Sequence, residues 1–197
     1  MIVLENITKT YNGQIVLENL TLTIPVRKIV FVTGISGIGK TTLLRILAGF
    51  EKPDSGTVSW PERPRIGMMF QENRLFESLS AKKNLEIIYP EKDPSGLERE
   101  LALILPETEL DKKVSELSGG TKRRVALVRA MLHPGNAVLL DEPFSSLDED
   151  NCRKVWDYIS RKQNGRTLII ASHWVPEEKT ADIIRLEVKN RRDYDQK

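Results

Sequence analysis

The sequence predicts an α/β fold: a mainly parallel sheet around a phosphate-binding loop, an antiparallel β-region ahead of the loop, and a helical subdomain inserted after it. Three observations lead to this prediction. The glycine-rich segment 34–42 lies between a strand-like apolar run and a helix-like one. Residues 137–140 and 168–171 form apolar runs that are typical of buried parallel strands. Residues 2–24 instead alternate between apolar and polar positions, which indicates a half-buried antiparallel sheet.

The N-terminal residues are expected to form a hairpin. Apolar positions recur at period two within residues 2–7 and 20–24. Between them, Asn12-Gly13 is a strong signal for a tight turn, because both residue types tolerate a positive φ. The elements expected next are a buried strand, a helix and two short strands, at residues 29–32, 42–48, 56–60 and 65–70.

Helical character begins after Gln71. Residues 72–117 are rich in Leu, Glu and Lys, and Ser95 and Glu98 have the spacing of a capping box. Because strand-like runs return near residue 137, the helical subdomain, at about 72–132, is expected to be an insertion within a single domain of residues 1–197. The remaining elements are expected to be a strand, a helix, two strands and a frayed charged tail, at residues 137–140, 148–162, 167–171, 182–188 and 189–197.

Composition narrows the class of protein. The chain has 197 residues, 40% of them hydrophobic, which is enough for one sizeable core. Its 30 basic and 28 acidic residues leave a net charge of +2, which argues against a nucleic-acid partner. The single cysteine, Cys152, excludes an intrachain disulfide and fits a reducing compartment. No apolar run approaches the roughly 20 residues of a membrane span, so we expect a soluble chain that reaches a membrane only through a partner.

Segment 34–42 matches the pattern G-x-x-x-x-G-K-[ST] of a loop that binds a nucleoside triphosphate. Glycines let backbone N–H groups turn inward, and the following helix N-terminus adds positive potential. Lys40 is expected to reach the β- and γ-phosphates, and the Thr41 hydroxyl to bind Mg²⁺. A glycine-rich turn with a surface lysine is the alternative, which the flanking strand and helix disfavour. The predicted nucleotide-binding residues are Gly34, Ser36, Gly37, Gly39, Lys40, Thr41 and Thr42.

Two carboxylates follow the apolar run 137–140. Asp141 at the carboxyl end of a strand beside a phosphate loop is expected to hold Mg²⁺. Glu142 points elsewhere and is expected to polarise a water for attack on the γ-phosphate. The alternative is a polar strand end that leads into a turn at Pro143. The phosphate loop in the same chain favours the functional interpretation.

A second anion-binding site is expected at residues 117–121. Ser118, Gly119 and Gly120 precede a helix with an apolar face, and a helix N-terminus attracts anions. Residues 122–124, Lys-Arg-Arg, place positive charge in the first turn, against the preference of the helix dipole, which suggests that positive potential is wanted there. A capped helix start with a solvated basic face is the alternative.

In their order along the chain, these motifs resemble those of the ATP-binding-cassette (ABC) ATPases, and the resemblance covers nearly the whole sequence. Thr121 departs from the family, whose signature usually ends in Gln, so less extensive contact with nucleotide is expected. The matching segments are Tyr11 at the adenine-stacking position, 34–42 as Walker A, Phe70-Gln71-Glu72 as the Q-loop, 117–121 as the signature, 137–142 as Walker B with its catalytic glutamate, 145–148 as the D-loop and Ala171-Ser172-His173 as the switch-histidine segment.

The resemblance implies a P-loop NTPase (RecA-like) core and ATP hydrolysis that drives transport across a membrane. Tyr11 would stack on adenine, which contributes roughly 1–3 kcal/mol, and His173 would hydrogen-bond the γ-phosphate. The cofactors implied are ATP and Mg²⁺. The implied catalytic residues are Lys40, Gln71, Glu142 and His173; the Mg²⁺ ligands are Thr41, Gln71 and Asp141; and the residues that reach the ATP of an opposite subunit are Ser118, Gly119 and Gly120.

The resemblance also implies partners. Two ATPase subunits, identical or homologous, would sandwich two ATP molecules head to tail. A membrane permease would hold them at the cytoplasmic face of the membrane, with a solute-binding protein as a further partner. Residues 60–75 look most like those of nitrate, sulfonate or taurine importers. Residues 72–79, with Leu75, Phe76 and Leu79, are expected to receive the permease; the alternative is that these side chains pack inward.

The phosphate loop leaves two other functions open. A non-transport ABC ATPase would usually carry a long coiled coil or a second cassette, and the sequence has neither. A regulatory scaffold that binds ATP without hydrolysing it would be expected to lack Glu142 or His173, and both are present.

Overall fold

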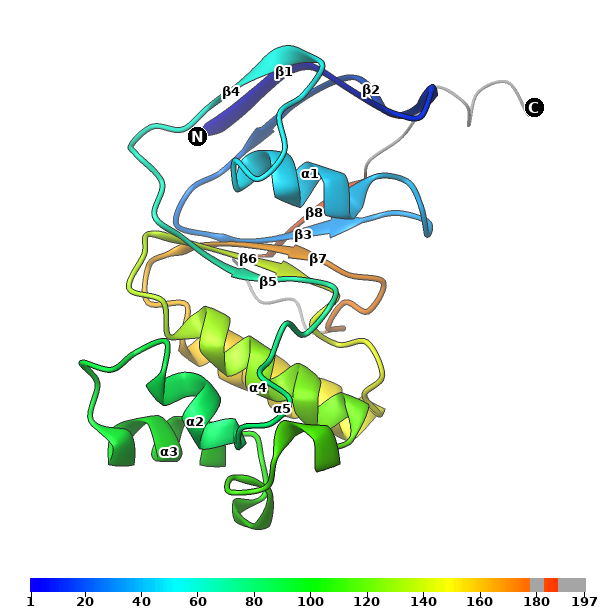
Figure 1. The fold of residues 1–197 in the computed structure, drawn as a ribbon. Helices are drawn as coiled ribbons and strands as arrows, with labels where there is room; N and C mark the ends of the chain where they lie inside the picture. The colour runs from blue at the N-terminus through cyan, green and yellow to red at the C-terminus, as the bar shows by residue number, and fades with distance from the viewer. Residues whose placement is uncertain (178–182, 188–197) are drawn as a thin grey trace.

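The computed structural model describes residues 1–177 and 183–187, and Figure 1 shows their arrangement. An antiparallel sheet has the strand order β2-β1-β4, and a parallel sheet has the order β5-β6-β7-β3-β8. The expected α/β class is confirmed, and the tail 189–197 lies outside the described residues. The strands are β1 (Ile2–Tyr11), β2 (Gln14–Ile24), β3 (Ile29–Thr33), β4 (Ser55–Ser59), β5 (Ile66–Met69), β6 (Ala137–Asp141), β7 (Thr167–Ala171) and β8 (Ile183–Glu187).

The antiparallel sheet begins with the expected hairpin. β1 and β2 pair in antiparallel register, with Tyr11 opposite Gln14. Asn12 and Gly13 form the turn at φ values of 48° and 79°. A two-residue turn with both φ values positive matches the right-handed twist of the strands that it joins. β4 pairs with the other edge of β1, also antiparallel.

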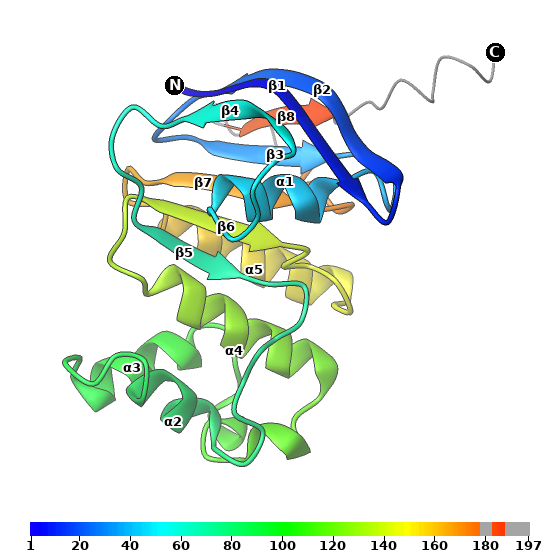
Figure 2. The same ribbon diagram turned by 45° about the horizontal axis from the view of Figure 1, so that its top comes forward.

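The helices form layers around the parallel sheet (Figures 1 and 2). α1 lies between the two sheets, α4 and α5 cover the opposite face of the parallel sheet, and α2 and α3 lie beyond α4. Successive residues of β3 alternate between the two resulting cores: Val30 and Val32 pack with α1, whereas Phe31 packs toward α5. The helices are α1 (Lys40–Leu47), α2 (Ala81–Glu86), α3 (Pro94–Ala102), α4 (Gly119–Met131) and α5 (Glu149–Arg161), with 3-10 turns at Glu107–Glu109 and Val114–Glu116.

The helical residues beyond β5 share the core of the parallel sheet. Leu85 of α2 and Leu101 of α3 belong to the same buried cluster as Val125 of α4 and Val138 of β6. The chain from β5 to β6 therefore packs on the sheet as one continuous body, and α4 is the layer that joins α2 and α3 to the strands.

α3 begins differently from the sequence prediction. Asp93 is its N-cap, and the Asp93 carboxylate accepts a hydrogen bond from the N–H of Gly96 at 2.9 Å. Ser95 donates its hydroxyl to the same carboxylate. The predicted capping box of Ser95 and Glu98 is therefore wrong, because Asp93 followed by Pro94 in the first turn is a stronger helix start.

The parallel sheet brings four chain segments to one edge. β3, β5, β6 and β7 run in the same direction, so their carboxyl ends meet there. β3 leads into the glycine loop, β5 into Gln71, β6 ends at Asp141, and β7 is followed by His173. In open α/β sheets, ligands bind outside the carboxyl ends of the strands. This edge is the place where the predicted site residues can meet.

Candidate functional site

The glycine loop ends at Gly39, which begins α1. Gly39 has φ 105°, and a Cβ there would lie 2.7 Å from Cδ2 of Leu17. Only glycine fits both the backbone angle and the space. Among the described residues, no side-chain hydrogen bond caps the start of α1 at Gly39. A helix start of this kind attracts an anion.

A cleft of about 430 Å³ opens above this helix start. Nine of its lining residues belong to the predicted site, and they come from the glycine loop, α1 and the ends of β5, β6 and β7. Val16 of β2 and Ser145 also line it, and neither was predicted to bind nucleotide. The lining residues are Val16, Ser36, Gly37, Gly39, Lys40, Thr41, Thr42, Gln71, Glu142, Ser145 and His173.

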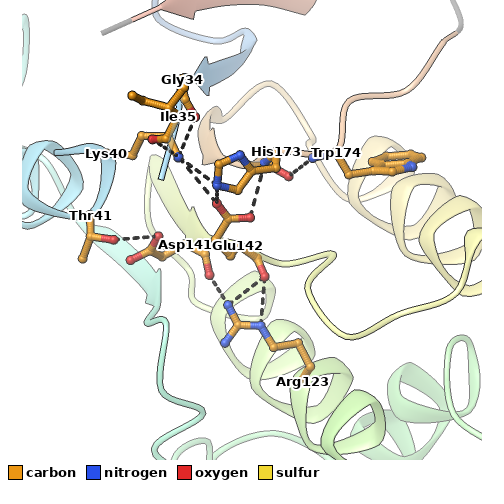
Figure 3. A network of polar contacts seen from close by, with 10 residues as sticks. Gly34, Ile35, Lys40, Thr41, Arg123, Asp141, Glu142, His173 and Trp174 are labelled. Atoms are coloured by element: carbon orange, nitrogen blue, oxygen red, sulfur yellow. Dashed lines mark hydrogen bonds and ion pairs between the residues drawn. The ribbon is translucent and has the colours of Figure 1, made fainter. Parts of the chain in front are cut away.

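Lys40, Glu142 and His173 converge in this cleft (Figure 3). The ammonium of Lys40 is 3.9 Å from Oε1 of Glu142 and 3.2 Å from Nε2 of His173. The backbone N–H of His173 donates to Oε2 of Glu142 at 3.3 Å. Lys40 also donates to the carbonyls of Gly34 and Ile35 at 2.9 and 3.2 Å, so its ammonium is directed along the glycine loop. A cation, a carboxylate and an imidazole therefore face one another in the cleft.

Glu142 adopts a left-handed backbone conformation with φ 51°. Such a conformation costs of order 1–3 kcal/mol in a residue other than glycine and persists only where neighbouring groups impose it. The Glu142 N–H donates to the carbonyl of Ala171 at 2.8 Å. The Glu142 carbonyl accepts from Nε and Nη2 of Arg123 at 3.0 and 2.8 Å. The peptide is held on both sides, and its side chain projects toward Lys40 (Figure 3).

Asp141 offers a ligand atom for a cation. Its side chain is buried, Oδ1 accepts from the Thr41 hydroxyl at 3.2 Å, and Oδ2 has no hydrogen-bond partner among the described residues. Burial raises the pKa of Asp141, and the Thr41 hydrogen bond opposes that rise. In the part of the chain that the structure describes, no cluster of three His, Cys, Asp or Glu side chains could hold a metal. Mg²⁺ fits such a site, because it usually combines one or two carboxylates with waters and substrate phosphates.

Several predicted residues lie outside the cleft. Tyr11 is 37% exposed at the end of β1, with Nζ of Lys9 5.3 Å from its ring centroid. Its stacking role stays a prediction. Ser118 is the N-cap of α4, and Gly119 and Gly120 form the first residues of that helix. These three do not line the cleft, which is consistent with a role at the ATP of another subunit.

The basic residues 122–124 do not form a free positive surface. Lys122 pairs with Glu77 at 2.9 Å, and Arg124 donates to Oδ1 of Asn151 at 2.5 Å. Arg123 is 4% exposed and points from α4 toward the carboxyl ends of β5 and β6. The alternative of a solvated basic face is therefore wrong for Arg123. The prediction that these charges provide potential for an anion stays a prediction, because Arg123 and Arg124 bond to uncharged groups, which leave their charge in place. Their partners lie far along the chain, where sequence spacing gives no signal.

Thr121 is buried at 3% exposure and faces the protein interior. Its N–H donates to the hydroxyl of Ser118 at 3.1 Å, and its own hydroxyl lies 2.9 Å from that oxygen. Nη2 of Arg124 donates to the Thr121 hydroxyl at 3.3 Å. Thr121 therefore supports the cap of α4, which gives a physical reason for a short hydroxyl side chain at this position.

The comparisons with known proteins agree with this geometry. The family model described as ABC transporter matches residues 17–145. An aliphatic sulfonates import ATP-binding protein, SsuB 2 of Agrobacterium fabrum, is 35% identical over 177 residues, which cover 86% of this chain and 68% of the relative. A spermidine/putrescine import ATP-binding protein, PotA of Marinobacter nauticus, is 36% identical over 187 residues, which cover 86% and 50%.

A solved structure extends the comparison to the fold. The ATP-binding cassette MJ0796, in a dimeric post-hydrolysis state bound to ADP and Pi, matches with a TM-score of 0.81 and 27% identity, over 96% of this chain and 97% of that one. This match confirms the P-loop NTPase core. None of the helices in the described residues has the length and apolarity needed to span a bilayer. The chain belongs to the ABC transporter family, as an ATP-binding cassette of the kind that hydrolyses ATP.

Proposed function

We propose that this chain is the ATP-hydrolysing subunit of an ABC transporter and powers solute movement through a separate membrane permease. The observation that carries the proposal is the convergence of Lys40, Gln71, Glu142 and His173 on one cleft at the carboxyl edge of the parallel sheet. A cation, an amide, a carboxylate and an imidazole around a phosphate loop can bind a triphosphate and position a water.

The binding groups divide into two sets. The N–H groups of the glycine loop and the ammonium of Lys40 would hold the phosphates. The Thr41 hydroxyl, the free Oδ2 of Asp141 and the Gln71 side chain would hold Mg²⁺, with Asp141 and Thr41 already 3.2 Å apart. When bound, Mg²⁺ would neutralise negative charge on the phosphates. The ADP and Pi in the matched MJ0796 structure support a nucleotide at this position.

The catalytic step falls to Glu142 and His173. The Glu142 carboxylate would take the proton of the attacking water as general base, and His173 would donate a hydrogen bond to the γ-phosphate. The 3.3 Å hydrogen bond from the His173 N–H to Glu142 holds the two residues together. Both groups are present and aligned in the cleft, which favours hydrolysis over a scaffold that only binds ATP.

We also propose that two cassettes close head to tail over ATP, with a second copy of this chain or a homologous subunit as the partner. Ser118, Gly119 and Gly120 lie apart from their own cleft and would complete the opposite one. The dimeric state of the matched MJ0796 structure supports this arrangement. The chain would then sit on the cytoplasmic side of the membrane, attached through the permease, with a solute-binding protein as a further partner of an importer.

The loop after Gln71 is the proposed permease contact. Phe76 is 49% exposed, and its backbone is held by the buried Asn84 through hydrogen bonds of 2.8 and 3.1 Å. Leu75 packs against the main core, so the inward-packing alternative is correct for that residue. Because the loop begins at a residue of the cleft, a permease bound at Phe76 could shift Gln71 directly.

The relatives bear on cargo as well as on activity. Residues 60–75 predicted an importer of the sulfonate group, and a sulfonate importer subunit is among the relatives at 35% identity. A spermidine/putrescine importer subunit has a similar identity of 36%. We propose an importer subunit on this basis. The similarity reflects the ATP-binding part, which these relatives share although their solutes differ.

Replacing Lys40 tests the proposed function. Lys40→Ala removes the ammonium that faces the cleft, so ATP binding should weaken strongly and hydrolysis should stop. Lys162→Ala is the matched control, because Lys162 lies at the C-terminal end of α5, pairs with Glu100 and does not line the cleft. The measurements are equilibrium binding of ATP and release of phosphate. Normal affinity and turnover in Lys40→Ala would overturn the assignment of the cleft.

A further inference from the structure

Arg123 is a charged side chain in the interior of the protein. Only 4% of it is exposed, and burial lowers its pKa, although a guanidinium keeps its proton in proteins. Among the described residues, its hydrogen bonds go to four backbone carbonyls and one side-chain amide oxygen, and none goes to a carboxylate. A buried charge is tolerated only when its donors are satisfied. The position of these acceptors therefore determines where Arg123 can lie.

One side of the guanidinium holds the chain that leaves β5. Nη1 donates to the carbonyls of Phe70 and Gln71 at 2.9 and 2.6 Å, and to Oδ1 of Asn73 at 3.2 Å. These three residues form the start of the loop that contributes Gln71 to the cleft. The backbone of Gln71 is thus tied to α4 rather than left to solvent.

The other side of the guanidinium holds the chain that leaves β6 (Figure 3). Nη2 donates to the carbonyls of Asp141 and Glu142, and Nε donates to the Glu142 carbonyl at 3.0 Å. Glu142 is the residue with φ 51°, and this carbonyl belongs to its strained backbone. One planar group therefore joins the two segments that carry Gln71 and Glu142.

We propose that Arg123 is a positioning residue for ATP hydrolysis, because its guanidinium holds the backbones of Gln71 and Glu142 at a fixed separation. A water that contacts both side chains can then be held in line with the γ-phosphate. The inference rests on the proposed function, since it takes Glu142 as the general base. Arginine suits this task because its planar fork presents five donors in fixed directions.

The test compares Arg123 with Arg166, a half-buried arginine. Arg166 also donates to backbone carbonyls, those of Met131, His133, Lys162 and Gln163, but none of these residues lines the cleft. Arg123→Met and Arg166→Met should both lower the melting temperature. Arg123→Met should in addition lower kcat by about 10- to 100-fold, as expected when catalytic groups lose their support. Its Kd for ATP should stay within about threefold of the wild type, since the phosphate loop is untouched.

Two further measurements separate positioning from stability. Hydrogen exchange of the nucleotide-free protein should speed up at residues 70–74 and 141–144 in Arg123→Met, and not in Arg166→Met. In a Glu142→Gln background, Arg123→Met should cause a much smaller loss of rate than in the wild type, because residues that act as a unit are non-additive. A full multiplicative loss in the double variant, or unchanged exchange in the single one, would overturn the proposal.

The possible failures remain distinguishable. If the wild-type chain hydrolyses no ATP, the proposed function fails. If Glu142→Gln hydrolyses ATP normally, the assignment of Glu142 as the general base fails, and the inference fails with it. If Glu142→Gln is inactive but Arg123→Met retains the wild-type kcat, only the inference fails. Should Arg123→Met not fold, Arg123→Lys decides: it keeps the charge but not the planar fork, so kcat should fall while the Kd for ATP stays unchanged. A wild-type kcat in Arg123→Lys would overturn the proposal.

Discussion

Asn84 offers a quantitative test of how the proposed permease loop is held. Its side chain is fully buried, and it makes three hydrogen bonds to backbone groups of the preceding loop. Oδ1 accepts from the Phe76 N–H at 2.8 Å, and Nδ2 donates to the carbonyls of Phe76 and Ser80 at 3.1 and 3.0 Å. Asn84→Ala removes all three bonds and leaves the Phe76 N–H without its acceptor, while the carbonyls of Phe76 and Ser80 keep the N–H groups of Leu79 and Asn84 as donors.

The size of the effect follows from these contacts. At about 0.5–1.5 kcal/mol for each net hydrogen bond, Asn84→Ala should lower the free energy of unfolding by about 2–4 kcal/mol. For a chain of this length that corresponds to a drop of roughly 5–15 °C in melting temperature. Because the loop presents Phe76, the variant should also bind its permease less well.

Asn136→Ala is the matched control. The Asn136 side chain also bonds two backbone groups, the N–H of Arg65 and the carbonyl of Arg63, but it does so at the surface. Water can replace those bonds, so the control should lose about 1 kcal/mol or less. Thermal melting monitored by circular dichroism measures both variants. Equal melting temperatures for Asn84→Ala and the wild type would refute the claim that the buried Asn84 amide stabilises the loop.

Two more predictions concern the surface of the helical layer and the start of α5. Phe76→Asp should abolish co-purification with the permease while ATP binding and melting stay normal, because Phe76 is 49% exposed. The control is Leu103→Asp, at a residue 58% exposed at the C-terminal end of α3, which should still assemble with the permease. Equal assembly of the two variants would contradict the docking site. Asp148 caps α5 by accepting from the Asn151 N–H at 2.8 Å, a bond that lowers the Asp148 pKa, so Asp148→Ala should melt at a lower temperature. Since the pKa of Asp148 is lower in the folded state, the difference in melting temperature between wild type and variant should be full above the unfolded pKa near 3.8. It should disappear as the pH falls through the folded pKa. Equal melting temperatures at neutral pH would contradict the cap.

The sequence predicts the architecture well where local patterns determine it. Apolar runs identify the parallel strands, and Asn12-Gly13 identifies the hairpin, because a buried strand and a two-residue turn each impose a composition. The glycine motif likewise locates the phosphate loop, since only Gly39 fits its backbone angle and its space. Each of these requirements acts within a few residues, so it leaves a trace in the sequence.

Tertiary partners leave no such trace. The sequence places Arg123 in the first turn of a helix, where a basic residue looks like a surface charge, but its acceptors lie 18 to 53 residues away. Val16 lines the cleft from a strand in the other sheet, which no spacing could indicate. The predicted cap of α3 is wrong for a different reason. Asp93 and Ser95 are both residue types that cap helices, and Pro94 in the first turn favours Asp93 as the N-cap.

The most direct test of the account is the fate of ATP on Glu142→Gln. The substitution keeps the shape of the side chain but removes the base, so ATP should still bind and hydrolysis should fall by about 10²–10⁴-fold. With ATP and Mg²⁺, the variant should elute as a dimer in size-exclusion chromatography, and Glu86→Gln, on α2, should hydrolyse ATP like the wild type. Hydrolysis by Glu142→Gln at the wild-type rate would contradict the assignment of Glu142 as the general base.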